Sequence, residues 1–303
     1  MNTQNKTLIT VVGPTAIGKT SLSIKLANHF NTEIISCDSR QFYKEMSIGT
    51  AVPDPDELSA APHHFIQNRS IFEDYNVGDY EKDALQTLDK LFQKHDVVIM
   101  VGGSGLYVDA VLKGFDDFPK IDSNIRVQLT EELHTKGLPY LQEKLKELDP
   151  DTYKSIAKDN PQRVTRALEV CIGTGKTYSS FKNKTKKKRN FHSLKVGLNG
   201  DREKIYDRIN LRVDLMIEAG LIEEAKQLYE HRNLNALQTV GYRELFSYFD
   251  GTFTKEFAIE EIKKNTRRFA KRQLTWFRRD QETIWFDFQS DIKEIIKTIE
   301  EKL

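Results

Sequence analysis

The sequence predicts an α/β fold, in which a parallel sheet with helices on both faces carries an inserted all-helical domain. Short apolar runs alternate with segments of helical spacing in most of the chain, whereas strand signals vanish between residues 115 and 192. At 303 residues the chain exceeds a typical single domain. We therefore expect a core formed by residues 1–114 and 193–303, with a helical insertion over residues 115–192.

Four short apolar runs are the expected strands of this sheet. They cover residues 8–12, 33–37, 97–101 and 194–198, and polar turns flank them, as is typical of strands buried on both faces. Gly13, Asp38 and Gly102 lie where three of these strands end. Because ligands of open α/β sheets gather at the carboxyl ends of the strands, a site is expected there. After residue 198, helices are expected up to the C-terminus.

Residues 13–20 match the pattern G-x-x-x-x-G-K-[ST] between an expected strand and an expected helix. In such a loop, backbone N–H groups surround phosphate oxygens, the lysine neutralises charge and the hydroxyl holds Mg²⁺. The loop predicts a P-loop NTPase-like core and a phosphorylated ligand, with Thr20 as the metal ligand. The expected phosphate-binding residues are Gly13, Pro14, Thr15, Ala16, Ile17, Gly18, Lys19 and Thr20.

The acidic residue with which P-loop hydrolases help to hold Mg²⁺ is missing from the end of the strand at 97–101. That strand runs instead into a Gly-Gly-Ser-Gly turn at residues 102–105. The nearest acid at a strand end is Asp38, whose carboxylate would be placed to remove a proton from an attacking nucleophile. Two alternatives stay open for Asp38, a helix N-cap and a group behind the Mg²⁺ ligands.

The composition bears on the compartment and on membranes. No apolar run approaches the roughly 20 residues that cross a bilayer, and the polar start of the chain lacks the apolar core of a signal peptide. A cytoplasmic location without membrane contact is therefore expected. Cys37 and Cys171 lie far apart in the sequence, which predicts buried thiols and neither a disulfide framework nor a cysteine zinc site.

The formal charge of +1 hides two basic clusters, with six Lys or Arg in residues 182–190 and eight in residues 263–279. Projected as a helix, residues 262–279 separate an apolar face from a basic one. The apolar face is expected to enter the core and the basic face to meet nucleic-acid phosphates. A membrane-surface helix and a solvated face are the alternatives. The apolar set is Ile262, Phe269, Ala270, Leu274, Trp276 and Phe277; the basic set is Lys264, Arg267, Arg268, Lys271, Arg272, Arg278 and Arg279.

Seven segments, in order along nearly the whole chain, resemble one family. They are residues 13–20; Asp38-Ser39 with Tyr43 and Ile48-Gly-Thr-Ala51; Pro62-His-His64; Gly102-Gly-Ser-Gly-Leu-Tyr107; Asn160-Pro-Gln-Arg163 with Arg166-Ala-Leu-Glu169; Val240-Gly-Tyr-Arg243; and Lys271-Arg-Gln-Leu-Thr-Trp276. Together they make the sequence similar to the tRNA dimethylallyltransferases, also called tRNA isopentenyltransferases. The C-terminal zinc finger of eukaryotic members is missing, so the bacterial type is implied.

The resemblance implies transfer of a dimethylallyl group from dimethylallyl diphosphate to the exocyclic amine of the adenosine 3′ of the anticodon in tRNA. The diphosphate bound by residues 13–20 is then a leaving group, which explains the missing hydrolase acid. Asp38 is the expected base. Lys19, Mg²⁺ on Thr20, Arg208 and Arg212 are expected to stabilise the departing diphosphate. The two arginines lie one helical turn apart, and solvated helix charges are their alternative.

Contacts with the anticodon stem-loop of tRNA are also implied by the resemblance. Asn160-Pro161 predicts the start of a helix, whose first turns then carry Gln162, Arg163 and Arg166. The target base must leave its stack to reach Asp38. The expected tRNA contacts are Asp38, Ser39, Arg40, Gln41, Ser104, Arg126, Gln162, Arg163, Val164, Thr165, Arg166, Gln238, Thr239, Val240, Gly241, Tyr242, Arg243, Lys271, Arg272, Trp276 and Arg278.

Three other functions remain open at this point. An isopentenyltransferase acting on free adenine nucleotides would not need the insertion, the segment 160–166 and the basic helix together. A P-loop kinase or ATPase is the commoner use of such a loop, and a non-catalytic RNA-binding module would retain it as a relic. The lysine-rich stretch at 182–189 is either a contact to the tRNA backbone or a solvated loop. No protein partner is implied, and a monomer fits.

Overall fold

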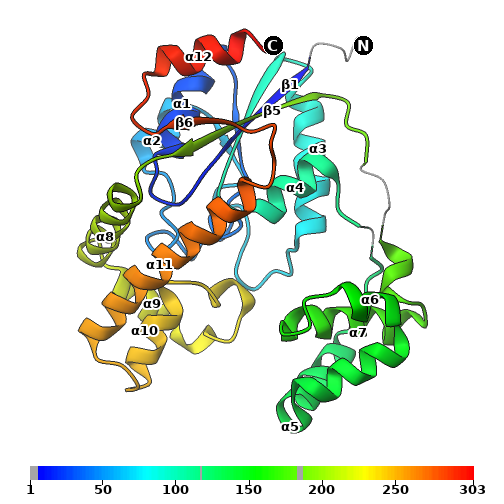
Figure 1. Ribbon diagram of the computed structural model, residues 1–303. Helices are drawn as coiled ribbons and strands as arrows, with labels where there is room; N and C mark the ends of the chain where they lie inside the picture. Colours follow the sequence, from blue (N-terminus) through cyan, green and yellow to red (C-terminus); the bar gives the residue numbers. More distant parts are fainter. Residues whose placement is uncertain (1–5, 117, 183–186) are drawn as a thin grey trace. The chain divides into compact units, whose positions relative to one another are not determined.

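The computed structural model describes residues 6–116, 118–182 and 187–303. The chain divides into two compact units, the first formed by Met1–Lys113 and Lys188–Leu303 and the second by Gly114–Lys187. Figure 1 shows the elements of both units in the colours of the sequence. Within the described residues, no helix combines the length and the apolar character needed to span a bilayer.

A parallel sheet of six strands forms the centre of the first unit, in the order β3-β2-β4-β1-β5-β6. This arrangement confirms the predicted α/β fold of the P-loop type. Each strand expected from the sequence is present. The strands are β1 (Thr7–Val12), β2 (Ile34–Ser36), β3 (His63–His64), β4 (Val97–Val101), β5 (His192–Asn199) and β6 (Ile284–Asp287).

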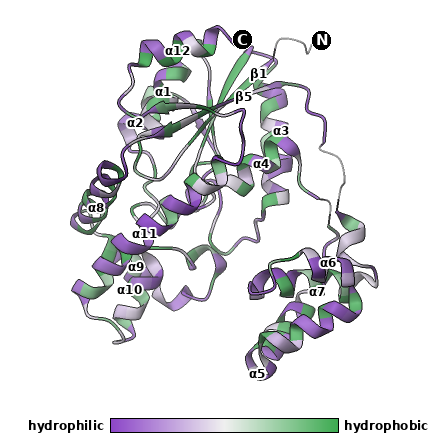
Figure 2. Ribbon diagram, viewed as in Figure 1, coloured by the Kyte–Doolittle hydropathy of each residue, from purple (hydrophilic) through white to green (hydrophobic). Residues whose placement is uncertain are grey.

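Helices cover both faces of the sheet because alternate residues of each buried strand point to opposite sides. Ile9 and Val11 of β1 pack with α1 (Lys19–Phe30), α8 (Arg202–Glu218) and α12 (Ile292–Glu300). Leu8 and Val12 pack on the other face with α3 (Val77–Leu91) and α4 (Gly105–Lys113). Figure 2 shows the apolar character of β1 and β5 between these layers.

A third apolar cluster joins the helices that follow β5. It contains residues of α8, α9 (Leu221–Gln227), α10 (Tyr242–Phe249) and α11 (Lys255–Phe277), together with Tyr43 and Met46. The long helix α11 contributes to all three clusters of the first unit, through Ile262, Ala270 and Phe277. The remaining helical segments of this unit are α2 (Pro55–Ala60), η3 (Tyr229–His231) and η4 (Asn235–Leu237).

Two strands were not expected from the sequence. The expectation of helices alone after residue 198 is wrong, because β6 pairs in parallel with β5 at the edge of the sheet. Strand β3 consists of two histidines and gives no apolar run, and the four residues of β6 lie in a region where the sequence predicts helices.

The second unit consists of helices: α5 (Ser123–Leu148), α6 (Pro150–Ser155), α7 (Pro161–Thr174) and η2 (Tyr178–Phe181). Leu129, Leu141 and Leu145 of α5 form its core with Val164 and neighbouring residues of α7. Helix α5 is kinked at Gly137, whose φ of 80° is non-helical. The predicted start of α7 is confirmed, because the Asn160 side chain accepts a hydrogen bond from the N–H of Arg163 and Pro161 is the first helical residue.

Candidate active site

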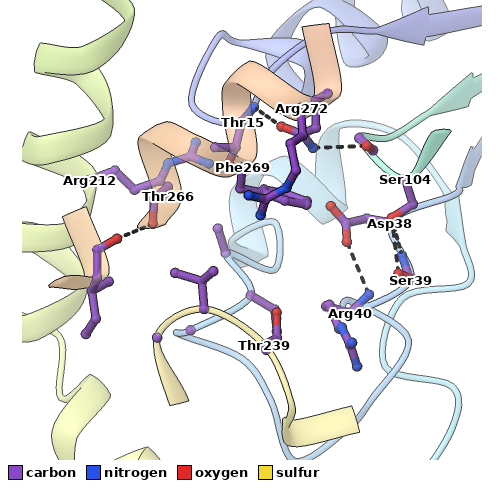
Figure 3. A pocket seen from close by; sticks show the side chains of 18 of the residues that line it. Thr15, Asp38, Ser39, Arg40, Ser104, Arg212, Thr239, Thr266, Phe269 and Arg272 are labelled. Atoms are coloured by element: carbon purple, nitrogen blue, oxygen red, sulfur yellow. Dashed lines mark hydrogen bonds between the residues drawn. The ribbon is translucent and has the colours of Figure 1, made fainter. Parts of the chain in front are cut away.

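A pocket of about 550 Å³ opens in the first unit at the carboxyl ends of the strands. Its walls come from the loop after β1, the turns after β2 and β4, helix α8, residues 238–243 and helix α11. Segments that are far apart in the sequence therefore meet around one cavity. Figure 3 shows several of the lining residues, among them Thr15, Asp38, Ser39, Arg40, Ser104, Arg212 and Arg272.

The P-loop leads directly into helix α1. Gly18 is the N-cap of this helix with a φ of 105°, a left-handed conformation that favours glycine, and no side chain caps the helix. The N–H groups of the first turn are thus left for an anion, at the positive end of the helix dipole. The Lys19 ammonium donates a hydrogen bond to the carbonyl oxygen of Pro14 over 2.8 Å. Thr20 lies in the first helical turn.

Asp38 follows β2 and lies in the wall of the pocket. One of its carboxylate oxygens accepts a hydrogen bond from the N–H of Arg40 at 3.2 Å. No helix begins here, since the chain turns over the next residues, and this removes the alternative of a helix N-cap. Burial raises the pKa of Asp38, while the Arg40 N–H and the charges of Lys19 and Arg212 oppose the rise.

Lys19 shares this electrostatic environment. Burial lowers its pKa from 10.5 to about 8, the negative charge of Asp38 opposes that change, and Arg212 adds to it. The three charged groups therefore act on one another at the base of the P-loop. With a pKa of about 8, Lys19 loses its charge at a lower pH than an exposed lysine, and a bound anion would favour the charged form.

The turn after β4 brings Ser104 to the segment that follows Asp38. The Ser104 hydroxyl accepts a hydrogen bond from the N–H of Ser39 at 3.2 Å, and the two hydroxyl oxygens lie 3.1 Å apart. Both serines line the pocket. The expected grouping of Asp38, Ser39 and Ser104 is therefore present in the structure.

The two arginines of α8 take different positions. Arg212 lines the pocket, and burial lowers its pKa, with the charge of Arg208 adding to the effect. The Arg208 Nε donates a hydrogen bond to the carbonyl oxygen of Ala16 at 2.8 Å, and its guanidinium lies 5.2 Å from the centre of the Phe288 ring. Arg208 thus holds the backbone of the P-loop, whereas Arg212 faces the cavity.

The segments at 38–41 and 238–243 contain several expected tRNA contacts. Gln238, Thr239, Val240, Gly241 and Arg243 line the pocket. Arg40 lies at the pocket as well, and its guanidinium donates hydrogen bonds to the carbonyl oxygens of Asn235 and Ala236. Gln41 instead donates from its side chain to the carbonyl oxygens of Thr50 and Ala51. Tyr242 is fully buried, so its side chain belongs to the core and not to a surface for tRNA.

Helix α11 differs in part from the predicted two-faced helix. Ala270 and Phe277 are buried and Lys271, Arg272 and Arg278 are exposed, as expected. Phe269, however, is 38% exposed and lines the pocket with Arg272 and Trp276, so it does not enter the core. The apolar side of this helix is narrower than the projection indicated, because the pocket begins where the core ends.

The second unit contains the remaining expected tRNA contacts, which are described here within that unit alone. Gln162 and Arg163 are exposed at the start of α7, whereas Val164 is 0% and Thr165 6% exposed. The last two side chains belong to the core of this unit because they fall on the inner face of α7.

A buried carboxylate joins two arginines of this unit. The Glu169 side chain is 3% exposed and forms ion pairs with Arg126 over 3.1 Å and with Arg166 over 3.0 Å. Arg126 comes from α5 and Arg166 from α7, and their side chains are 63% and 41% exposed. Glu169 therefore fixes both guanidinium groups while leaving much of their surface accessible.

The lysine-rich stretch lies only partly within the described residues, because residues 183–186 fall outside them. Its last basic residue, Arg189, belongs to the first unit and is not a solvated charge. The Arg189 guanidinium pairs with Glu81 over 2.7 Å and donates to the carbonyl oxygens of Ala110 and Val111. Arg189 thus fixes the chain just before β5.

Two important residues of the site were not identified from the sequence. Gln273 is buried in α11 and contacts both glycine-rich turns. It lies in the family segment at 271–276, which assigns it no role, and its other signal is a polar residue at the helical spacing of the buried Ala270 and Phe277. Glu224 of α9 accepts hydrogen bonds from the backbone N–H groups of Ser47, Ile48 and Gly49 and from the Tyr242 hydroxyl. It holds the pocket wall formed by residues 49–51.

Within the described residues, no group of three or more His, Cys, Asp or Glu side chains could hold a metal ion. Cys37 and Cys171 are free and buried, as predicted. A cation at the P-loop would therefore need oxygen ligands from a bound phosphate and water besides the Thr20 hydroxyl. This donor set suits Mg²⁺, which retains water and is held through substrate phosphates.

Comparisons with known proteins agree with this geometry. The tRNA dimethylallyltransferase of Flavobacterium johnsoniae is 62% identical over 304 residues, which are 98% of each chain. That of Cytophaga hutchinsonii is 50% identical over 99% of this chain and 98% of its own. The crystal structure of the tRNA isopentenylpyrophosphate transferase of Bacillus halodurans superposes with a TM-score of 0.72 at 39% identity, covering 99% of this chain and 97% of that one.

A structure of a eukaryotic dimethylallyltransferase acting on tRNA superposes with a TM-score of 0.78 at 27% identity. It covers 98% of this chain, whereas the match covers 77% of the eukaryotic one. The profile of the IPP transferase family matches residues 41–280. Because this match spans most of the sequence and the relatives are similar over nearly their whole length, the chain belongs to the IPP transferase family.

Proposed function

We propose that this chain transfers a dimethylallyl group from dimethylallyl diphosphate to the exocyclic amine of the adenosine 3′ of the anticodon in tRNA, and releases diphosphate. One observation carries the proposal. The pocket is lined by Asp38 and by Thr15 of the P-loop, Asp38 interacts electrostatically with Lys19, and the neighbouring strand β4 ends in glycines and a serine instead of an acid. The names of the relatives, tRNA dimethylallyltransferases, support the same reaction.

The reaction needs a base because the lone pair of an adenine amine is delocalised into the ring. In the proposed step, a bond forms between this nitrogen and the allylic carbon while the bond from that carbon to the diphosphate oxygen breaks. The electron pair leaves with the diphosphate, and the Asp38 carboxylate accepts the proton from the amine. The raised pKa of Asp38 makes its carboxylate a better proton acceptor than an exposed aspartate.

Negative charge develops on the diphosphate as it departs, and positive groups meet it. We assign this role to Lys19, to the uncapped N–H groups at the start of α1 and to Arg212 in the pocket wall. Arg208 contributes by holding the Ala16 carbonyl, and so the shape of the P-loop. We further propose that the Thr20 hydroxyl is the protein ligand of Mg²⁺, which would supply charge neutralisation for the diphosphate.

The proposal assigns tRNA contacts to each unit separately. In the first unit they are Asp38, Ser39 and Arg40, the segment at 238–241 with Arg243, and the exposed basic residues Lys271, Arg272 and Arg278 of α11. In the second unit, Gly114–Lys187, they are Gln162, Arg163 and the two arginines joined by Glu169. Phosphate contacts position an RNA, and the target base must be unstacked to enter the pocket.

The decisive experiment is an incubation of the protein with dimethylallyl diphosphate and either unmodified tRNA or AMP, followed by chromatography of prenylated adenosine. Product from tRNA alone supports the proposal. Product only from AMP would establish the free-nucleotide enzyme instead. Nucleotide hydrolysis without any prenyl donor would favour a kinase or an ATPase.

The pH dependence of the reaction follows from the two perturbed groups. Lys19 must be charged to bind diphosphate, so kcat/KM for the donor should fall as the pH rises through about 8. Asp38 must be deprotonated to act as the base. Because its pKa is raised, the rate should fall on the acidic side of the pH profile at a higher pH than an exposed aspartate would cause. Because arginine stays protonated, Lys19→Arg should move the basic limb to higher pH. A basic limb that stays in place in this variant would contradict the assignment.

The basic face of α11 can be tested through the salt dependence of tRNA binding. Replacing Arg268 and Arg272 by glutamine should weaken binding and reduce the slope of log Kd against log salt by about one for every phosphate that is no longer neutralised. The double replacement of Lys293 and Lys297 by glutamine removes the same charge from α12 and should leave the slope unchanged. Equal slopes in all three proteins would show that α11 is merely solvated.

A further inference from the structure

The side chain of Gln273 connects three parts of the site that the sequence separates widely. We infer that Gln273 is a positioning residue, whose amide sets the distance between the P-loop and the glycine turn after β4 and ties both to helix α11. The inference rests on the proposed function, because it concerns how this site binds the diphosphate donor. It extends that function to a residue outside the groups already assigned to the reaction.

Both ends of the amide are used. The Gln273 Oε1 accepts a hydrogen bond from the N–H of Thr15 over 2.9 Å, and its Nε2 donates one to the carbonyl oxygen of Gly103 over 3.0 Å. Gln273 is 5% exposed in the pocket wall, so both hydrogen bonds are largely shielded from water. A carboxamide has one acceptor and one donor group, which this pair of backbone partners requires.

Glycines in the turn after β4 allow helix α11 to approach its backbone closely. A Cβ atom at Gly103 would lie 2.1 Å from the Gln273 Nε2, and one at Gly105 would lie 2.3 Å from Cδ1 of Trp276. Both distances are too short for real atoms. Two glycines of this turn are therefore in direct contact with α11, and a side chain at Gly103 would displace the amide of Gln273.

The N–H of Thr15 therefore stabilises the loop and does not bind phosphate. Since it already donates to Gln273, it is not one of the N–H groups left for phosphate oxygens. Its hydrogen bond instead holds the first half of the P-loop at a fixed place relative to the turn after β4. The helix start beyond Gly18, which lacks a side-chain cap, keeps the free N–H groups.

The second hydrogen bond acts on the opposite wall of the pocket. Gly103 precedes Ser104, whose hydroxyl accepts from the N–H of Ser39, and Ser39 follows Asp38. The buried amide of Gln273 thus supports the P-loop on one side and, through Ser104, the segment that carries Asp38 on the other. Displacements of about 1 Å at such supports are enough to lower rates by about 10²-fold.

Helix α11 also carries groups that face the cavity. Phe269, Arg272 and Trp276 line the pocket on the same helix as Gln273. Any movement of α11 when tRNA binds to its basic face would therefore be passed to the P-loop through Gln273. We expect donor affinity to depend on this residue, whereas tRNA affinity depends on the exposed arginines.

The test is Gln273→Met, which keeps the length of the side chain and removes both hydrogen bonds. The expected result is an increase of at least about tenfold in the KM for dimethylallyl diphosphate and a lower kcat. The dissociation constant for tRNA should be unchanged. Thr32→Val serves as the matched control, because it removes a buried hydrogen bond to the carbonyl of Val97, the first residue of β4, at the end of the strand that lies away from the pocket. This control should lower the thermal stability without changing the donor KM.

A second variant keeps the inference testable if Gln273→Met does not fold. Gly103→Ala should push the amide away and raise the donor KM in the same direction. Gln273→Ala removes the amide that a Cβ atom at position 103 would meet. Adding Gly103→Ala to this variant should therefore raise the donor KM little further. Independent, additive effects of the two changes would overturn the inference, as would a donor KM of wild-type size in Gln273→Met. Absence of prenyl transfer in the unmodified protein would instead refute the proposed function.

Discussion

Replacing Asp38 by asparagine should lower kcat for prenyl transfer by about 10²–10⁴-fold, the usual contribution of a general base. The amide keeps an oxygen for the hydrogen bond from the Arg40 N–H, so the turn is preserved. The variant lacks only the proton acceptor for the adenine amine. Single-turnover rates with bound tRNA and donor would measure this effect directly, and the affinity for tRNA should be nearly unchanged.

Asp54→Asn is the matched control for this substitution. Asp54 is the N-cap of α2, and asparagine caps a helix about as well as aspartate, so the activity and the stability should stay close to those of the unmodified protein. A single-turnover rate of wild-type size in Asp38→Asn would remove Asp38 as the base. A joint loss of tRNA binding would show that it acts on the RNA instead.

The second large effect is expected at the other end of the transferred group. Lys19→Met should lower kcat/KM for dimethylallyl diphosphate by about 10²–10³-fold, because a preorganised positive charge no longer meets the departing diphosphate. Methionine fills a similar space, and the absence of the hydrogen bond to the Pro14 carbonyl is a smaller change. Initial rates at varied donor concentration and saturating tRNA would separate KM from kcat.

Lys25→Met provides the comparison on the same helix. Lys25 is exposed on α1, so the substitution removes an equal charge without altering the loop, and the kinetics should not change. If both lysine variants behaved alike, the effect would belong to net charge. Unaltered donor kinetics in Lys19→Met would show that the diphosphate binds elsewhere.

The centre of the fold was predictable because its signals are local. The runs around β1, β2, β4 and β5 are long enough and apolar enough to be read directly, and the pattern at residues 13–20 fixes a loop between a strand and a helix. The start of α7 was predictable for the same reason, since Asn160 and Pro161 act within one turn. The family resemblance then connected these separate motifs with one reaction.

The parts that were missed depend on distant partners. Strand β6 forms by pairing with the edge of β5, and its four residues stand among helical segments, so the sequence alone does not show this pairing. Gln273 lies 258 positions from Thr15, and Glu224 lies 175 positions from Gly49. Neither pairing can be inferred from the spacing of residues in one sequence. Phe269 was misplaced because helical periodicity does not show where a core ends and a cavity begins.

The arrangement around Glu169 affects how mutations of the second unit will behave. Its buried carboxylate relies on Arg126 and Arg166 for compensating charge, so removing either arginine weakens the electrostatic support of a buried acid. Replacing either arginine should therefore lower the free energy of unfolding of this unit, whatever its effect on RNA binding. The fold alone therefore constrains these two positions, and neither arginine is free to change independently of the carboxylate between them.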